Sequence, residues 1–198
     1  MAKIGLSKPY CAMYNNSGQT VTYSEGALIG KAVELSIEVE ASDDNILYAD
    51  NGPAETATTF TGGTFTLTTD DLMPDVMATI LGLQKQDITS EKITTASPKW
   101  YVWNDKQMTP YMGFGAVVKI QRSGSIKWQA VVLPKIKFSN PSDTFQTQGE
   151  TIEWGTPEIN GTIQRSDAAD GPWKLISTPM DSESDAEEAV KLILQITE

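Results

Sequence analysis

The 198-residue sequence contains no histidine and a single cysteine, Cys11. The absence of histidine excludes Ser-His-Asp and Cys-His catalytic arrangements and every zinc site that needs a histidine ligand. One cysteine forms neither an internal disulfide nor a thiolate metal cage, so we interpret Cys11 as a small buried residue of a strand. Catalysis by paired carboxylates or by a lysine is still compatible with this composition, but we predict that the protein is not an enzyme.

Long apolar segments are also missing. No run approaches the roughly 18 residues that a membrane-spanning helix requires, and residues 1–9 lack the hydrophobic segment of a signal peptide. We therefore expect a protein that folds in a cytoplasm and has no membrane partner. Its length suits a single domain over residues 1–198.

Basic residues are outnumbered, since 15 Lys and Arg oppose 26 Asp and Glu and leave a net charge of −11. This balance disfavours a protein that grips nucleic acid through its phosphates, which requires clustered basic side chains. It is compatible with a protein that DNA passes without binding, and also with acidity that serves solubility alone.

Strand patterns dominate the sequence. Residues 33–40 alternate apolar and polar side chains without interruption, which is typical of a strand with one buried face, and residues 63–68 repeat the pattern with threonine on the polar side. Two hairpins are predicted, with loops at 15–18 and 122–125 that each contain a glycine for a positive φ angle. Shorter strands are predicted at 99–103, 151–154, 158–165 and 173–177.

Two helices interrupt the strands. The first is predicted over 71–81, capped by Thr69, Asp70 or Asp71 and followed by Gly82. The second is predicted over 185–195, within a C-terminal helical segment at 182–198, with Ser184 and Glu187 as a capping box. These elements predict a mainly β (α+β) fold, a β-sandwich or partial barrel with a flanking α-helix and a C-terminal helix.

Residues 41–62 form a connection of 22 residues between two predicted strands. Such a length is unusual in a compact domain and typical of functional loops, and we expect a protruding hairpin with residues 46–48 in one arm. Asp43, Asp44 and Asn45 lack the spaced ligands of a calcium loop and are interpreted as a solvated turn. We predict no metal site and no cofactor.

Two other groups of residues are of types that can carry chemistry. Glu150 and Glu153 lie three apart in a predicted strand, so their side chains should point to opposite faces rather than form a catalytic pair. Trp100, Tyr101, Trp103 and Tyr111 cluster around one loop. Such aromatics stack on sugars when exposed and pack or anchor interfaces otherwise, with packing or an interface favoured.

Nine segments spread over nearly the whole chain carry a resemblance to a known family: 1–6, 47–51, 54–55, 60–63, 80–82, 110–115, 137–143, 147–154 and 157–163. In their order and spacing they resemble the major tail protein (tail tube protein) family of long non-contractile-tailed phages. The resemblance implies a structural virion protein with a tail-tube fold and no catalytic motif. It also implies assembly in the host bacterial cytoplasm and a final place in the virion tail.

The same resemblance implies hexameric rings that stack into a tube, with DNA passing through the channel without specific binding. The partners it implies are other copies of the chain, the tape measure protein, the tail terminator and distal tail proteins. The connection at 41–62 would be an inter-ring loop, whose candidate contact residues are Asp43, Asp44, Asn45, Ile46, Leu47, Tyr48 and Phe60.

The alternation of residues 33–40 adds a prediction about the channel. If Val33, Leu35, Ile37 and Val39 face the core, the opposite face carries the channel-lining candidates Glu34, Ser36, Glu38 and Glu40. Two other classes compete with this interpretation. A type VI-like secretion tube protein would share the fold, and a carbohydrate-binding β-sandwich would use the aromatic cluster between Trp100 and Tyr111.

Overall fold

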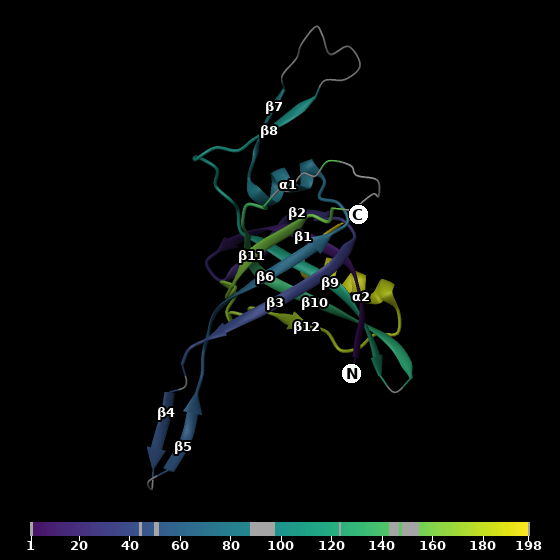
Figure 1. The fold of residues 1–198 in the computed structure, drawn as a ribbon. Helices are drawn as coiled ribbons and strands as arrows, with labels where there is room; N and C mark the ends of the chain where they lie inside the picture. The colour runs from purple at the N-terminus through teal and green to yellow at the C-terminus, as the bar shows by residue number, and fades with distance from the viewer. Residues whose placement is uncertain are drawn as a thin grey trace.

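The computed structural model describes residues 2–43, 45–49, 52–87, 98–122, 124–142, 147 and 155–197, with backbone alone at 45–49 and 52–57. Within these residues eight strands form one antiparallel sheet, in the order β2-β1-β9-β10-β11-β6-β3, with β12 paired to β10. Four further strands form two separate hairpins (Figure 1). The strands of the large sheet are β1 (Ala2–Ser17), β2 (Thr20–Leu28), β3 (Ala32–Ala41), β6 (Phe60–Thr69), β9 (Met112–Arg122), β10 (Ser125–Phe138), β11 (Glu158–Gln164) and β12 (Leu175–Ile176).

The large sheet curls until its two halves face each other. Leu6 of β1 and Ile37 of β3, far apart in the strand order, both pack against a buried cluster of Val118, Ile120 and Val131. The central core between the halves includes Phe65, whose ring centre lies 5.7 Å from that of Phe114 and 5.4 Å from that of Phe138. The predicted mainly β (α+β) fold, with two helices of which one is C-terminal, is confirmed.

The strand β9 is buried on both faces, because a different layer covers each. Ala116 belongs to the central core, whereas its neighbour Val117 belongs to a second cluster beneath the helix α2 (Glu183–Ile193). Successive side chains of a strand point to opposite faces, so α2 and the half-sheet of β3, β6 and β11 lie on opposite sides of β9. Cys11 is buried in the central core as predicted, and burial raises the pKa of its thiol to about 12.

The helix α1 (Pro74–Leu81) closes one end of the core with Ala78, Ile80 and Leu81. It begins three residues later than predicted, and no side chain caps its first residue, Pro74. Two of the expected caps are engaged elsewhere. Asp70 accepts a hydrogen bond from the Lys31 backbone amide at 2.7 Å, and Thr69 is the buried last residue of β6. The predicted stop is confirmed, since Gly82 follows the helix with φ 69°.

The helix α2, in contrast, begins two residues before its predicted start. Ser182, rather than Ser184, accepts a hydrogen bond from the Asp185 amide at 3.0 Å. Glu187, expected in the capping box, instead accepts a hydrogen bond from the Tyr10 hydroxyl at 2.5 Å and lies 3.4 Å from the ammonium groups of Lys8 and Lys191. Tertiary contacts with β1 therefore replaced the local cap.

The turns of the two large hairpins are tighter than predicted. Ser17 pairs with Thr20 and Arg122 pairs with Ser125, which leaves two residues in each turn instead of four. Gly18 and Gly124 have φ angles of 64° and 80°, the left-handed backbone that a glycine adopts without strain. The predicted strand at 151–154 lies outside the described residues.

The two small hairpins leave the body at opposite ends in Figure 1. One is formed by β4 (Asn45–Ala49) and β5 (Gly52–Ala57), inserted between β3 and β6. The other is formed by β7 (Gln84–Asp87) and β8 (Lys99–Val102), which follow α1.

Candidate functional site: the outer face of β3, β6 and β11

The outer face of β3, β6 and β11 is a polar surface assembled from three strands. The pairing places Glu34, Thr68 and Glu158 in one row across the sheet. The next row holds Ser36, Thr66 and Asn160, and the third holds Glu38, Thr64 and Thr162. We call the outward side chains of these three strands the acidic face.

Strict alternation creates this surface. Along β11, the residues Ile159, Gly161 and Ile163 are buried while Glu158, Asn160 and Thr162 are exposed. Along β6, the residues Phe65 and Leu67 lie in the core while Thr64 is exposed. Within the acidic face Thr66 donates a hydrogen bond to Asn160 Oδ1 at 2.6 Å, which fixes part of the polar row.

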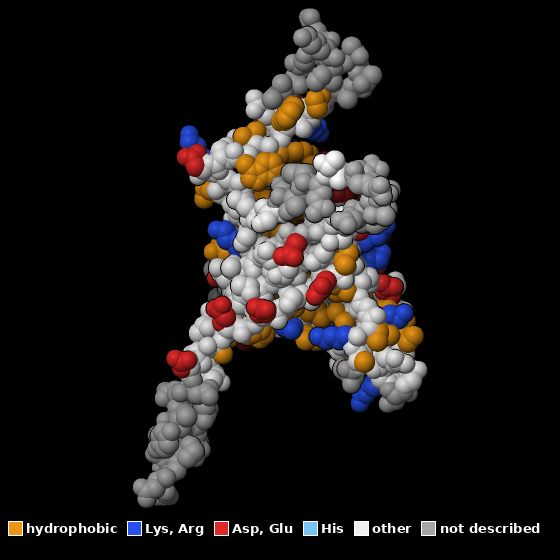
Figure 2. Space-filling model, viewed as in Figure 1, with side chains coloured by type: hydrophobic (Ala, Val, Ile, Leu, Met, Phe, Trp, Pro, Cys, Tyr) orange, Lys and Arg blue, Asp and Glu red, His pale blue; other side chains and the backbone are white. Residues whose placement is uncertain are grey.

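The charge of this surface has one sign. The three strands carry four glutamates, Glu34, Glu38, Glu40 and Glu158, all exposed, and no lysine or arginine. Acidic side chains are scattered over this side of the molecule in Figure 2. Within the described part of the chain, the three glutamates of β3 take part in no ion pair. Their charge is therefore directed to solvent.

Two lysines of β10 border the acidic face. Lys137 pairs with Thr162 and Lys135 with Gln164, so both stand beside β11. They are partly held by other contacts, because their ammonium groups lie 5.7 Å and 4.7 Å from the centre of the Tyr111 ring. Lys135 also forms an ion pair of 2.7 Å with Asp167.

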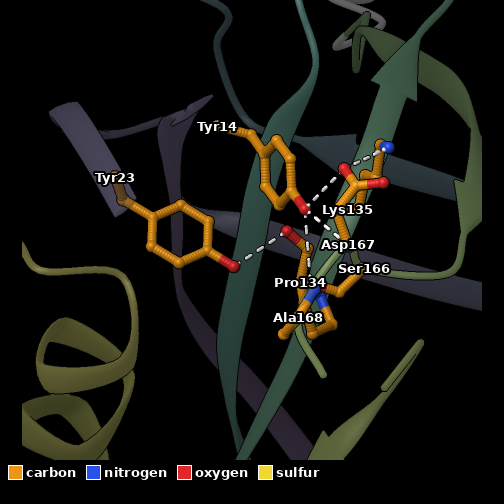
Figure 3. Close-up of polar contacts among 7 residues, drawn as sticks. All are labelled: Tyr14, Tyr23, Pro134, Lys135, Ser166, Asp167 and Ala168. Atoms are coloured by element: carbon orange, nitrogen blue, oxygen red, sulfur yellow. Dashed lines mark hydrogen bonds and ion pairs between the residues drawn. The ribbon is translucent and has the colours of Figure 1, made fainter. Parts of the chain in front are cut away.

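That ion pair belongs to a polar cluster that fixes the segment after β11 (Figure 3). The Tyr14 hydroxyl donates to Asp167 Oδ2 at 3.0 Å and accepts from the Asp167 amide at 2.8 Å. The Tyr23 hydroxyl donates to the Pro134 carbonyl at 3.0 Å. Hydrogen bonds from Lys135 and Tyr14 hold the pKa of Asp167 below its ordinary value.

The strand β3 ends the sheet, and no other strand of the described residues pairs with its outer edge. The prediction that four of its apolar residues face the core is right for Leu35 and Ile37, which are half-buried, and wrong for Val33 and Val39, which are 56% and 48% exposed. Val39 lies opposite Gly63, which offers no side chain to pack against, and Val33 lies in a register shift. Ten residues of open strand edge are a template for pairing with another chain.

The predicted 41–62 connection is a hairpin on a closed neck. Ser42 and Thr59 join its ends: the Ser42 amide donates to the Thr59 carbonyl at 2.8 Å, the Thr59 amide donates to Ser42 Oγ at 3.0 Å, and the two hydroxyl groups lie 3.4 Å apart. Beyond this neck, β4 and β5 pair only with each other in the described strands. Asp43 is exposed at the neck, Asn45, Ile46, Leu47 and Tyr48 lie in β4, and Asp44 lies outside the described residues.

Phe60 differs from the other candidates for the inter-ring loop. It is the first residue of β6, pairs with Ala41, and stacks on Trp173 with ring centres 4.6 Å apart. Its ring packs against the central core. Phe60 therefore belongs to the body of the protein, and the hairpin that projects is limited to β4 and β5.

The predicted aromatic cluster is divided in the structure. Tyr101 turns towards α1 and donates a hydrogen bond to Asp75 at 2.9 Å, and Tyr111 lies beneath the two lysines of β10. Trp100 and Trp103 are 51% and 45% exposed. The four rings do not form a shared sugar-stacking platform.

Sequence reasoning missed Glu158 and the threonine rows as members of the acidic face. The alternation of residues 158–164 is visible in the sequence, but nothing local shows that β11 pairs with β6. Among the described residues, no three His, Cys, Asp or Glu side chains group as a metal site would require.

No protein-family model matches the chain, and a search of curated proteins finds no match. In the described part of the chain, neither helix has the length and apolar character needed to cross a bilayer.

Proposed function

We propose that the protein is a structural virion protein, the subunit of stacked hexameric rings that form the tail tube of a long non-contractile-tailed phage. The observation that carries the proposal is the acidic face: a broad polar side of a β-sheet that no helix of the described residues covers, bounded by the open edge of β3. The helix α2 lies on the opposite side, where it would face the exterior of a ring.

The charges suit a channel for DNA. Six copies of the four glutamates would place 24 carboxylates around the lumen. At physiological salt the Debye length is about 8 Å, so these carboxylates act on DNA that passes within that distance of the wall; the wall then repels phosphates and lets DNA slide. The threonines and asparagine between the glutamates keep the wall hydrated without adding positive charge that would hold the DNA.

The free edge of β3 suits the ring itself. A subunit that offers an open strand edge extends its sheet by pairing with a neighbour, and a head-to-tail contact that closes on itself generates a ring. The exposed valines Val33 and Val39 at this edge would then be covered by the next subunit.

The first test is the assembly state of the purified full-length chain. Negative-stain electron microscopy and mass photometry are expected to show six-fold rings or tubes. Monomers alone at high concentration, even with tail-initiating components present, would contradict the proposal.

The second test addresses the channel. Replacing Glu34, Glu38 and Glu40 with lysine raises the charge of each subunit by 6, from −11 to −5, and that of a hexameric ring from −66 to −30. Exposed substitutions cost little stability, so tubes should still form, but phage carrying this variant should eject DNA slowly at low ionic strength and recover at high salt.

A matched control replaces three exposed acidic residues outside the acidic face with lysine: Glu25, Asp170 and Glu188. This control changes the charge of each subunit by the same +6. This control should eject DNA at the wild-type rate. If the β3 variant ejected DNA normally at low salt, or if both variants slowed ejection equally, β3 would not line the channel.

A further inference from the structure

We infer that the end of the protein formed by α1 and β8 is the docking surface for the β4–β5 hairpin of a second copy in the next ring. The inference rests on the proposed function and identifies the surface that receives the hairpin. Four exposed apolar residues lie at this end: Met73 precedes α1, Trp100 lies in β8, Trp103 follows β8, and the backbone of Met108 lies against Gly82 at the end of α1; we call them the tryptophan platform.

The side chains of the tryptophan platform are apolar although they are exposed to solvent. Met73, Trp100, Trp103 and Met108 are 57%, 51%, 45% and 86% exposed. Figure 2 shows hydrophobic side chains gathered over α1 and the base of the β7–β8 hairpin. Tryptophan and methionine are enriched at interfaces because they bury a large apolar area, so their joint exposure on one end indicates a partner.

The platform is also held rigidly. The Asp75 carboxylate of α1 accepts a hydrogen bond from Tyr101 at 2.9 Å and forms an ion pair of 2.7 Å with Lys85, which ties both strands of the β7–β8 hairpin to the helix. Gln107 donates to the Leu81 carbonyl and to Asn140 Oδ1, each at 3.0 Å. A surface fixed in this way loses little conformational entropy on binding.

Strand geometry directs Trp100 outwards. Tyr101 is anchored to α1, and neighbouring residues of a strand point to opposite faces. The anchoring of Tyr101 therefore presents the ring of Trp100 on the face of β8 that turns away from the helix.

The position of the two hairpins identifies the occupant. β4–β5 and β7–β8 leave the body at opposite ends (Figure 1). Identical subunits stacked head to tail therefore bring the β4–β5 end of one copy against the α1–β8 end of the next. At ~3.3 Å per residue, the five residues of β4 extend roughly 16 Å beyond the neck, far enough to reach a neighbour.

Composition and charge favour the same occupant. Ile46, Leu47 and Tyr48 form three consecutive large apolar residues of β4. Residues 41–62 contain four acidic residues and no basic one. On the platform end, Lys85, Lys99 and Lys106 stand against Asp71, Asp75, Asp87 and Asp105. The net charge of −1 there repels an acidic hairpin less than the acidic face does, whose three strands carry four glutamates and no basic residue. Six such contacts per ring act together, so each one can be weak.

The direct test is photo-crosslinking from the platform in assembled tubes. The full chain carries benzoylphenylalanine in place of Trp103, and isotopically light and heavy subunits are mixed before assembly and irradiation. We expect crosslinks between light and heavy chains that map to residues 45–57. The matched control places the same probe at Leu192, which is 75% exposed on α2, and should give no crosslink to 45–57. Crosslinks from position 103 that stay within one chain, or that map elsewhere, would overturn the inference.

A substitution test separates this inference from the proposed function. The double variant Trp100→Ser and Trp103→Ser should form rings like the wild type but at least tenfold fewer tubes, whereas Leu192→Ser should form both. Tubes at the wild-type yield from the double variant would overturn the docking surface alone. A wild-type chain that forms no tubes would instead overturn the proposed function.

Discussion

Tyr14 and Asp167 are joined by two hydrogen bonds that share one hydroxyl group: Tyr14 donates to the Asp167 carboxylate at 3.0 Å and accepts from the Asp167 amide at 2.8 Å (Figure 3). Tyr14 lies in β1 and Asp167 follows β11. The pair therefore attaches the segment after β11 to the N-terminal strand of the sheet. Tyr14 is 7% exposed, so water cannot readily replace either bond.

Removing the hydroxyl should therefore destabilise the protein. Tyr14→Phe is expected to lower the free energy of unfolding by about 1–2 kcal/mol, since it leaves the Asp167 amide without its acceptor. Urea denaturation measures the loss, and amide hydrogen exchange should show faster opening at residues 166–168. Tyr111→Phe is the matched control, because among the described residues the Tyr111 hydroxyl makes no hydrogen bond and its ring still faces both lysines. An equal loss in both variants would argue against a special role for Tyr14.

The attachment of α2 should depend on pH through Glu187. Burial raises the pKa of this carboxyl, but the hydrogen bond from Tyr10 and the charges of Lys8 and Lys191 lower it more, so it lies below its ordinary value. A carboxyl whose pKa is lowered by folding stabilises the protein above its unfolded pKa, which is roughly 4.3, and loses that contribution as the pH falls through the folded pKa. Stability should therefore decline on acidification below about pH 5.

Glu187→Gln tests this dependence. The variant should be less stable than the wild type at pH 7, by about 1–2 kcal/mol, and the two denaturation midpoints should converge by pH 3. The exposed neighbour Glu188→Gln should keep the wild-type profile between pH 3 and 7. A constant difference between Glu187→Gln and the wild type across this range would show that Glu187 is not the titrating group.

The close approach of α2 to the sheet depends on Gly115. A β-carbon added there would lie 2.6 Å from Val190 Cγ1, closer than packed side chains allow. Gly115→Ala should therefore push α2 outwards and cost about 1–3 kcal/mol, measured by thermal or urea denaturation. Gly155→Ala is the control, because a β-carbon at that position meets nothing within 4 Å. It should be neutral, or stabilise slightly by restricting the unfolded chain.

A strand could be predicted from the sequence where its own alternation of apolar and polar residues was regular. The alternation of residues 33–40 and 63–68 depends on which side chains prefer water, and β3 and β6 occur there. The glycines that end α1 and turn the β9–β10 hairpin were equally visible, because a left-handed φ is a local requirement.

Features that depend on distant neighbours could not be predicted in this way. Glu158 joins the acidic face because β11 pairs with β6, and the sequence does not specify that pairing. Val39 is exposed because it meets Gly63 across the sheet. Ser182 became the cap of α2 because Tyr10 and Lys8 engage the glutamate that a local capping box would have used.

The β4–β5 hairpin should be dispensable for folding and required for tubes. Its neck is closed by the hydrogen bonds between Ser42 and Thr59, and in the described strands β4 and β5 pair only with each other. Replacing residues 44–57 with a two-residue Asn-Gly turn should therefore leave the circular dichroism spectrum of the body unchanged and shift the melting temperature by only a few degrees, about the change that 1 kcal/mol produces in a domain of this size.

The same deletion should leave rings intact and abolish tubes in electron micrographs, because it removes the segment that reaches the neighbouring ring and none of the open edge of β3. A control that keeps the hairpin length but replaces the four acidic residues of 41–62 with serine should still form tubes at raised salt, where charge contributes little. Unfolding of the deletion variant would place the hairpin in the core of the domain. Normal tubes from it would show that the contacts between rings lie elsewhere.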